Sequence, residues 1–227
     1  MVDFDPYRDR YDDELRHAVG RIGDPALYTE IKARVLVEIA ARFLGPPIEL
    51  SVLDVGCGPG LTDAFLTREF GSVAGVDVSR RMVERAREAN PGACYEVYDG
   101  GRLPFETGSF DLTFAICVFH HVEPPSWQAL AAEILRVTRS GGLIAVLEHN
   151  PLNPLTRMVV ARCEFDDGVD LLGIRKTKRL LTASGAKLVA SKYIVFFPWH
   201  AQLFRRAERA IGFVPFGAQY LVVGRRP

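Results

Sequence analysis

Val52-Leu53-Asp54-Val55-Gly56-Cys57-Gly58-Pro59-Gly60 is the stretch that decides the fold of this chain. It predicts a short apolar strand over Ser51–Val55, then a glycine-rich turn, then a helix from about Leu61 to Phe70. Glycines let the backbone at such a turn pass close to a ligand. The amide groups at the start of the following helix favour an anionic group. By itself, the turn therefore indicates a nucleotide-like ligand held by a strand–turn–helix unit.

Strands and helices alternate outward from this turn. Thr29 and Ser79 are the expected N-caps of two of the helices. The further expected strands are Val73–Asp77, Cys94–Tyr98, Phe110–Cys117, Leu143–Leu147, Lys187–Phe197 and Gln219–Gly224. The further expected helices are 29–44, 79–90, 126–138 (ended by Gly141-Gly142), 176–184 and 201–211. This alternation predicts an α/β fold: a Rossmann-like, doubly wound, mostly parallel seven-stranded sheet, whose two late strands pair antiparallel at its edge.

A length of 227 residues favours a single domain. We divide it into an N-terminal helical cap (1–47), a ligand-binding core (48–149), an insertion (150–175) and the C-terminal part of the sheet (176–227). Residues 1–28 and the insertion are expected to cover the crevice as a lid. Phe196, Phe197, Trp199 and Phe204 suit either an acceptor pocket or the core, and we favour the core.

Composition narrows the class of partner. The formal net charge is zero, so the chain has no basic excess for nucleic acid, and we expect no nucleic-acid partner. The acidic start, Met1-Val2-Asp3-Phe4-Asp5, is not a signal peptide, and no apolar run is long enough to insert in a membrane. We expect a cytoplasmic protein whose four scattered cysteines are free thiols.

Three acidic residues follow consecutive strands of the predicted sheet. Asp54, Asp77 and Asp99 are separated by 23 and 22 residues, one strand–helix unit each. The carboxyl ends of parallel strands face one crevice, where ligands bind. An acid after the second strand can accept hydrogen bonds from both ribose hydroxyls, and one after the third can accept from an adenine amino group. Each acid alone also suits a strand end or a helix cap, but three in register favour an adenosine-containing ligand.

Residues 50–150 resemble the class I methyltransferases that use S-adenosylmethionine, with a type 11-like methyltransferase domain. The resemblance rests on Gly108-Ser109-Phe110-Asp111-Leu112, Val118-Phe119-His120-His121-Val122 and Arg136-Val137-Thr138-Arg139-Ser140-Gly141-Gly142-Leu143. It implies S-adenosyl-L-methionine as cofactor and S-adenosyl-L-homocysteine as product. The cofactor-binding residues that it implies are Asp54, Gly56, Cys57, Gly58 and Gly60 for the methionine part, Asp77 for the ribose, Val78, Met82, Asp99 and Gly100 around the adenine, and Cys117 beside the methionine part.

Histidines after the fourth and fifth strands are the candidate catalytic residues. Methyl transfer is a direct displacement that depends mainly on alignment, and an oxygen nucleophile often needs a base as well. His149 is the preferred base and His121 the weaker candidate. In the family that the chain resembles, a histidine of the His120-His121 pair more often shapes the cofactor site. His149 also suits a polar loop that packs on the insertion.

The acceptor is expected to be a small molecule. Methyltransferases of DNA-base amines carry an Asn/Asp-Pro-Pro-aromatic turn where this chain has Cys117-Val118-Phe119-His120. We expect methylation of oxygen rather than of nitrogen or carbon. Glu148–Pro154 and Cys163-Glu164-Phe165-Asp166 resemble methyltransferase-like proteins found alongside sugar and polysaccharide biosynthesis, so the expected acceptor is a sugar or natural-product intermediate. No metal ligands are expected, because Asp166, Asp167 and Asp170 suit a solvated face. The alternatives are a cofactor-binding regulatory or scaffold protein without catalysis and a nicotinamide-dependent oxidoreductase.

Overall fold

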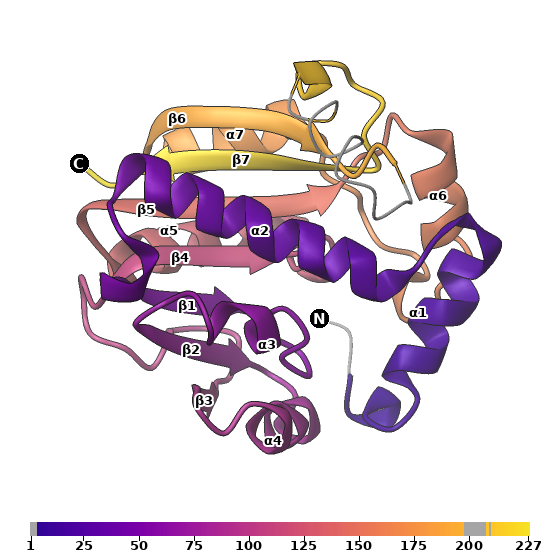
Figure 1. Ribbon diagram of the computed structural model, residues 1–227, viewed down its shortest axis with the longest axis horizontal. Helices are drawn as coiled ribbons and strands as arrows, with labels where there is room; N and C mark the ends of the chain where they lie inside the picture. The colour runs from indigo at the N-terminus through magenta and orange to yellow at the C-terminus, as the bar shows by residue number, and fades with distance from the viewer. Residues whose placement is uncertain (1–3, 198–207, 209) are drawn as a thin grey trace.

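The glycine-rich turn follows an inner strand of a seven-stranded sheet (Figure 1). A computed structural model of the protein describes residues 4–197, 208 and 210–227. The strands are β1 (Ser51–Val55), β2 (Ser72–Asp77), β3 (Cys94–Val97), β4 (Phe110–Ile116), β5 (Thr138–His149), β6 (Lys187–Ile194) and β7 (Gln219–Arg225). Their order is β3-β2-β1-β4-β5-β7-β6. The predicted doubly wound α/β fold is confirmed.

The direction of the strands places the crevice. β1 to β5 pair in parallel, whereas β7 is antiparallel to both β5 and β6. The strand order reverses between β1 and β4, and ligands of open α/β sheets bind outside the carboxyl ends of the strands at such a point. The predicted pairing of the two late strands is confirmed, with β6 as the outer one.

Helices cover both faces of the sheet. They are α1 (Tyr11–Val19), α2 (Pro25–Phe43), α3 (Asp63–Leu66), α4 (Arg80–Ala89), α5 (Trp127–Val137), α6 (Pro154–Val160) and α7 (Ile174–Ala183). Side chains of α2 pack with Val52 of β1, and those of α5 and α7 pack on the opposite face with Leu53. Neighbouring strand residues thus supply the two layers of the core, which is why the parallel strands are apolar throughout.

Short 3-10 turns join these elements: η1 (Asp5–Tyr7), η2 (Gly20–Ile22), η3 (Pro47–Glu49), η4 (Phe119–His121), η5 (Pro124–Ser126) and η6 (Glu164–Asp166). In the described residues, no helix is long and apolar enough to cross a membrane. All four cysteines are free thiols in the structure.

The start of α2 corrects the sequence prediction. The helix begins at Pro25, and its cap is Asp24, whose Oδ1 accepts a hydrogen bond from the amide of Ala26 at 3.0 Å. Thr29 is a buried residue inside the helix, and its hydroxyl donates to the carbonyl of Pro25. Ser79, by contrast, caps α4 as predicted. The earlier start adds a full turn of α2 beside the crevice.

Gly141-Gly142 does not end a helix, as had been predicted. α5 ends at Val137, and β5 begins at once and passes through both glycines. A Cβ on Gly142 would lie 2.7 Å from the carbonyl oxygen of Asp111, and the pairing of β4 with β5 shifts register beside that residue. The glycines therefore allow a bulge in the sheet.

Two other predicted helices differ from the structure. The helix after the glycine turn is the short α3 rather than the expected 61–70. The helix expected over 201–211 falls mainly on residues outside the described part of the chain.

Candidate active site

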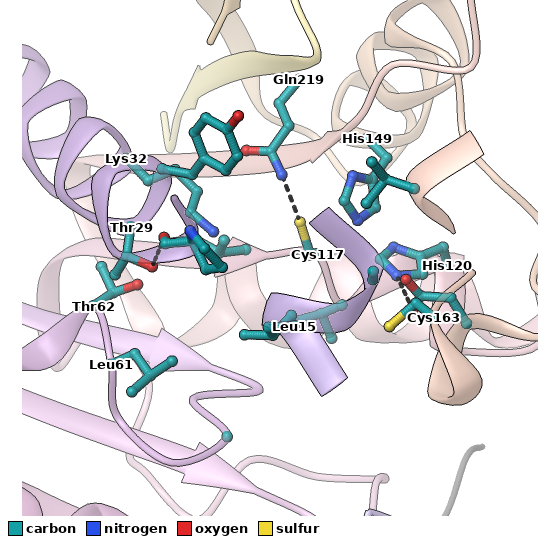
Figure 2. Close-up of a pocket in the computed structure, with 18 of the residues that line it drawn as sticks. Leu15, Thr29, Lys32, Leu61, Thr62, Cys117, His120, His149, Cys163 and Gln219 are labelled. Atoms are coloured by element: carbon teal, nitrogen blue, oxygen red, sulfur yellow. Dashed lines mark hydrogen bonds and ion pairs between the residues drawn. The ribbon is translucent and has the colours of Figure 1, made fainter. Parts of the chain in front are cut away.

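A cavity of about 320 Å³ lies at the carboxyl ends of the central strands. Its floor comes from the glycine-rich turn after β1 and from the ends of β2, β4 and β5. Its walls come from α1, from the first half of α2, and from the segment that contains α6 and η6. Figure 2 shows side chains from these segments converging on the cavity.

The glycine-rich turn presents its backbone to the cavity. Gly56 and Gly58 have φ of 78° and 51°, a left-handed conformation that favours glycine. A Cβ on Gly56 would lie 2.5 Å from Val118, whereas a Cβ on Gly58 would meet nothing within 4 Å. Gly56 is therefore required by packing, and Gly58 opens onto space in which a ligand fits.

Asp77 is fixed between the glycine turn and α4. One carboxylate oxygen accepts from the amide of Gly58 at 2.8 Å, and the other accepts from the amide of Ser79 at 2.9 Å. Burial raises the pKa of this carboxyl, although these amides work against the shift. A buried acid held by two backbone amides at the cavity wall is a rigid acceptor for ligand hydroxyls.

A second acidic pair lies behind the turn. Asp54 Oδ1 is buried without a hydrogen-bond partner, and Asp63 accepts from the hydroxyl of Tyr95 at 2.9 Å. Burial, followed by the charges of Asp63 and Asp77, raises the pKa of Asp54. The cavity floor is therefore poor in positive charge and suits a cationic ligand.

Lys32 of α2 is the nearby cation that the sequence analysis missed. Figure 2 shows it reaching into the cavity beside Thr29, on the wall opposite the histidines. It has no ion-pair partner within the part of the chain that the structure describes. Its charge opposes the raised pKa of Asp54.

Histidines occupy the other side of the cavity. His120 Nδ1 lies 2.7 Å from Glu148 Oε2, and Glu148 Oε1 accepts from the amide of Phe119 at 2.8 Å. Burial would lower the pKa of His120, but the charge of Glu148, its contact with Asp166 and its hydrogen bond to Glu148 raise it well above its usual value. This half of the site is an interconnected set of buried imidazole and carboxylate groups.

His149 and His121 both line the cavity and are held neutral. Burial lowers the pKa of His149 to about 4, with the charge of His120 as the next cause, and the two rings lie 5.1 Å apart. The same two causes lower the pKa of His121 to about 3. Each neutral ring keeps a nitrogen lone pair that can accept a proton or bind a cation.

Comparison with known proteins identifies the fold and the ligand of the half of the cavity that the glycine-rich turn forms. Residues 52–142, which contain β1, the turn, Asp77 and β4, match the model of the methyltransferase domain family. The match supports a class I S-adenosylmethionine-dependent methyltransferase domain over these residues. The matched region ends inside β5, so His149 and the insertion lie beyond it.

Two curated relatives match the methyltransferase domain. The 2-methyl-6-phytyl-1,4-hydroquinone methyltransferase of Synechocystis sp. is 34% identical over 142 residues, which cover 58% of this chain and 44% of that protein. Methyltransferase GfsG of Streptomyces halstedii is 36% identical over 104 residues, covering 43% of this chain and 37% of that protein. The chain thus spans less than half the length of these relatives.

Solved structures resemble the whole fold. A SAM-dependent methyltransferase of Thermotoga maritima, titled a possible histamine N-methyltransferase, has a TM-score of 0.69 at 20% identity and covers 99% of this chain and 98% of that one. A S-adenosylmethionine-dependent methyltransferase of Mesorhizobium loti has a TM-score of 0.61 at 25% identity, with 83% and 96% coverage. The layers around the methyltransferase domain therefore also follow this fold.

The cavity of the methyltransferase domain includes some of the predicted cofactor residues and leaves out others. Those that line it are Asp54, Gly56, Cys57, Gly58, Asp77, Val78 and Cys117. Those that do not are Gly60, Met82, Asp99 and Gly100. Lining residues that the sequence analysis missed include Thr29, Lys32, Thr62, Tyr98 and Gln219.

The residues outside the cavity have structural contacts of their own. A Cβ on Gly60 would lie 2.5 Å from Asn90 Nδ2, so this glycine lets the turn pack on α4. Met82 is buried, and Asp99 is exposed and accepts from the amide of Gly101 at 2.9 Å. Cys117, in contrast, projects into the cavity with φ of 57°, and the amide of Gln219 donates to its sulfur (Figure 2).

Asp166 corrects the prediction of a solvated acidic face. Asp167 and Asp170 are exposed, but Asp166 is 7% exposed, and its Oδ1 lies 3.4 Å from His120 Nε2 and 3.3 Å from His121 Nε2. The 3-10 turn η6 carries Asp166 inward because its neighbour Phe165 is also buried. No local sequence pattern predicts this contact, because 45 residues separate Asp166 from His121.

The two segments predicted to form a lid pack on each other. The ring of Phe165 stacks on Tyr11 at 5.2 Å, with an interplanar angle of 5°, and also contacts Phe4. Arg85 of α4 pairs with Asp12 at 2.6 Å, which ties α1 to the cofactor side. Residues of 4–28 and of the insertion line the cavity, and their closure as a lid stays a prediction.

The aromatic run after β6 contributes to the same cavity. Phe196 and Phe197 are partly exposed and line it, although the sequence analysis favoured the core for them. Trp199 and Phe204 lie outside the described residues.

Proposed function

We propose that this protein transfers the methyl group of S-adenosylmethionine to a hydroxyl oxygen of a small molecule, such as a sugar or natural-product intermediate. The observation that carries the proposal is one cavity that joins the glycine turn and Asp77 on one side to a neutral His149 on the other. A covered cavity of about 320 Å³ suits a small molecule better than a macromolecule.

The residues of the glycine half fit the cofactor. The unpartnered Asp54 Oδ1 would accept from the ammonium group of the methionine part, and Lys32 would pair with its carboxylate. Asp77 would accept from the ribose hydroxyls, because its two oxygens are already oriented by the amides of Gly58 and Ser79. When bound, the cofactor supplies an electrophilic methyl carbon on a sulfonium. The acidic floor favours that positive charge.

The other half would orient and activate the acceptor. His149 would take the proton that a hydroxyl acceptor loses as its oxygen is methylated. The buried Glu148 and His120 fix the end of β5 from which His149 projects. The aromatic lid, which includes Phe165 and Tyr11, would exclude water and bind an apolar part of the acceptor.

Relatives support a small-molecule acceptor. The Synechocystis relative is named for a hydroquinone, which is a small molecule. Another solved structure of the same fold is titled a geranyl diphosphate C-methyltransferase in complex with S-adenosyl-L-homocysteine. We infer a small acceptor for this chain as well, and choose oxygen as the methylated atom because His149 lines the cavity.

Calorimetry with S-adenosylmethionine, S-adenosylhomocysteine and NADH tests the proposal at the level of the cofactor. We expect saturable binding of both sulfur compounds and none of NADH. Release of S-adenosylhomocysteine in the presence of a panel of sugars, phenols and hydroxylated polyketides then tests transfer to oxygen. Binding of NADH alone would overturn the proposal, and cofactor binding without turnover on any acceptor would favour a scaffold role.

A further inference from the structure

Three donor atoms converge at the joint between the core and the lid. His120 and His121 come from the 3-10 turn after β4, and Asp166 comes from η6 in the insertion. One ligand atom from each lies within 4.8 Å of the other two. We propose that His120, His121 and Asp166 bind a divalent transition-metal ion such as Zn²⁺ inside the cavity. The sequence analysis expected no metal here.

The spacing of the donor atoms fits such an ion. Asp166 Oδ1 lies 3.4 Å from His120 Nε2 and 3.3 Å from His121 Nε2. Tetrahedral ligands at about 2.1 Å from zinc are about 3.4 Å apart, so these two edges are already of the right length. The third edge joins the ligand nitrogens of His120 and His121. A small rotation of the His121 ring, whose side chain is 10% exposed, would bring it to the same length.

The lone pairs in this cluster have no other partner. His120 Nε2 and Asp166 Oδ1 are buried and make no hydrogen bond within the part of the chain described. His120 Nδ1 is occupied by Glu148, so the free nitrogen is the one that faces Asp166. A buried imidazole nitrogen and a carboxylate oxygen that face each other need a proton or a metal ion between them. A divalent ion can take that position.

The balance of charge also favours an ion. Glu148 and Asp166 are two buried carboxylates, and no lysine or arginine pairs with either in the described residues. A divalent ion offsets the charge of both carboxylates.

Glu148 supplies the second layer that metal-binding histidines usually have. Its Oε2 lies 2.7 Å from His120 Nδ1, and its Oε1 is held by the amide of Phe119. A carboxylate in this position fixes the tautomer and orientation of the imidazole and raises its basicity as a ligand. Glu148 is therefore a positioning residue for the ion.

The ligand set selects the kind of metal. Two imidazole nitrogens with one carboxylate suit Zn²⁺, Fe²⁺ or Co²⁺ and are a poor match for Mg²⁺ or Ca²⁺, which take oxygen ligands. Three protein ligands leave a coordination position, and all three residues line the cavity. An oxygen of the acceptor would fill that position. This last step rests on the proposed function, whereas binding of the ion does not.

Titration of the chelator-treated full chain with Zn²⁺ by calorimetry tests the site with no cofactor or acceptor present. We expect one ion per chain, and at least about tenfold weaker binding in Asp166→Asn and His121→Asn. The matched controls are Asp167→Asn and His17→Asn, which change exposed residues of the same types and should bind as wild type does. Thermal unfolding shows whether each variant is folded.

Visible absorption of bound Co²⁺ gives a second measurement. Wild type should show the intense bands of a low-coordinate site, and Glu148→Gln should weaken Co²⁺ binding by about tenfold or more without removing a ligand. The proposal is overturned if wild type shows no saturable binding, or if Asp166→Asn binds as tightly as wild type. Either result would remain informative if methyl transfer itself failed, because no turnover is measured.

Discussion

The two halves of the cavity differ in how the chain builds them. The cofactor half comes from one local unit, the turn after β1, and from Asp77 at the end of the adjacent strand. The histidine half joins η4, the end of β5 and the insertion, which are distant in sequence. The first half lies within the region that matches the methyltransferase domain family, whereas the second half extends past it. A local unit builds the first half, whereas the second half depends on long-range packing.

The largest effect is expected for a substitution of His149, which alters the histidine half of the cavity and leaves the cofactor half intact. His149→Ala should lower kcat by about 1000-fold, because a positioned base typically contributes this much. Binding of S-adenosylhomocysteine should be unchanged, because the cofactor half is intact. Steady-state kinetics on an identified acceptor and calorimetry measure the two quantities.

His17→Ala is the control, since His17 is exposed on α1. Full activity of His149→Ala would exclude the base assignment. Weakened cofactor binding in that variant would show that the two halves are not independent.

Asp77→Ala should produce the opposite pattern. The loss of charged hydrogen bonds to the ribose should weaken cofactor binding by about 100-fold. Asp99→Ala should change it by less than about twofold, because Asp99 is exposed and lies outside the cavity. Calorimetry with S-adenosylhomocysteine compares the two variants.

This pair of variants tests the point on which sequence and structure diverge. If Asp99→Ala weakens binding as much as Asp77→Ala does, the adenine contact predicted from the sequence forms only when the cofactor is bound.

The smallest expected effect concerns the acidic floor. Burial raises the pKa of Asp63 from 3.8 to about 7. The folded protein therefore keeps this proton between about pH 4 and 7, and the contribution of Asp63 to stability falls as pH rises through that window. Asp63→Asn imitates the protonated acid and can still accept from Tyr95. Relative to wild type, it should gain about 2.5 kcal/mol of unfolding free energy at pH 8 compared with pH 5.

Urea unfolding at the two pH values measures the gain. An equal difference between variant and wild type at both values would mean that Asp63 is already ionised in the folded protein. The floor would then carry the negative charge of an ionised Asp63.

Elements could be predicted from sequence wherever local chemistry determines them. β1 and the cap at Ser79 were placed correctly because an apolar strand and a serine before a helix act over a few residues. Gly141-Gly142 misled the prediction, because a glycine pair suits either a helix end or a sheet bulge. Only the pairing of β4 with β5 decides between these.

The candidate site divides in the same way. Asp77 could be placed at the crevice because it ends a strand next to β1. Asp99 also follows a strand, but it turns outward to accept from the backbone of Gly101. The direction of a side chain after a strand depends on the loop that follows, which strand spacing does not determine.

The fold and the methyl donor could be inferred from the sequence alone. The positive φ of the glycines and the order of the strands are backbone properties, and they act within one strand–helix unit. Only the tertiary structure decided that Lys32 faces the acidic floor and that Asp166 meets His120 and His121. Those contacts arise from packing of α2 and the insertion over the sheet. Burial of apolar side chains such as Phe165 drives that packing, and it carries no short-range signal in the chain.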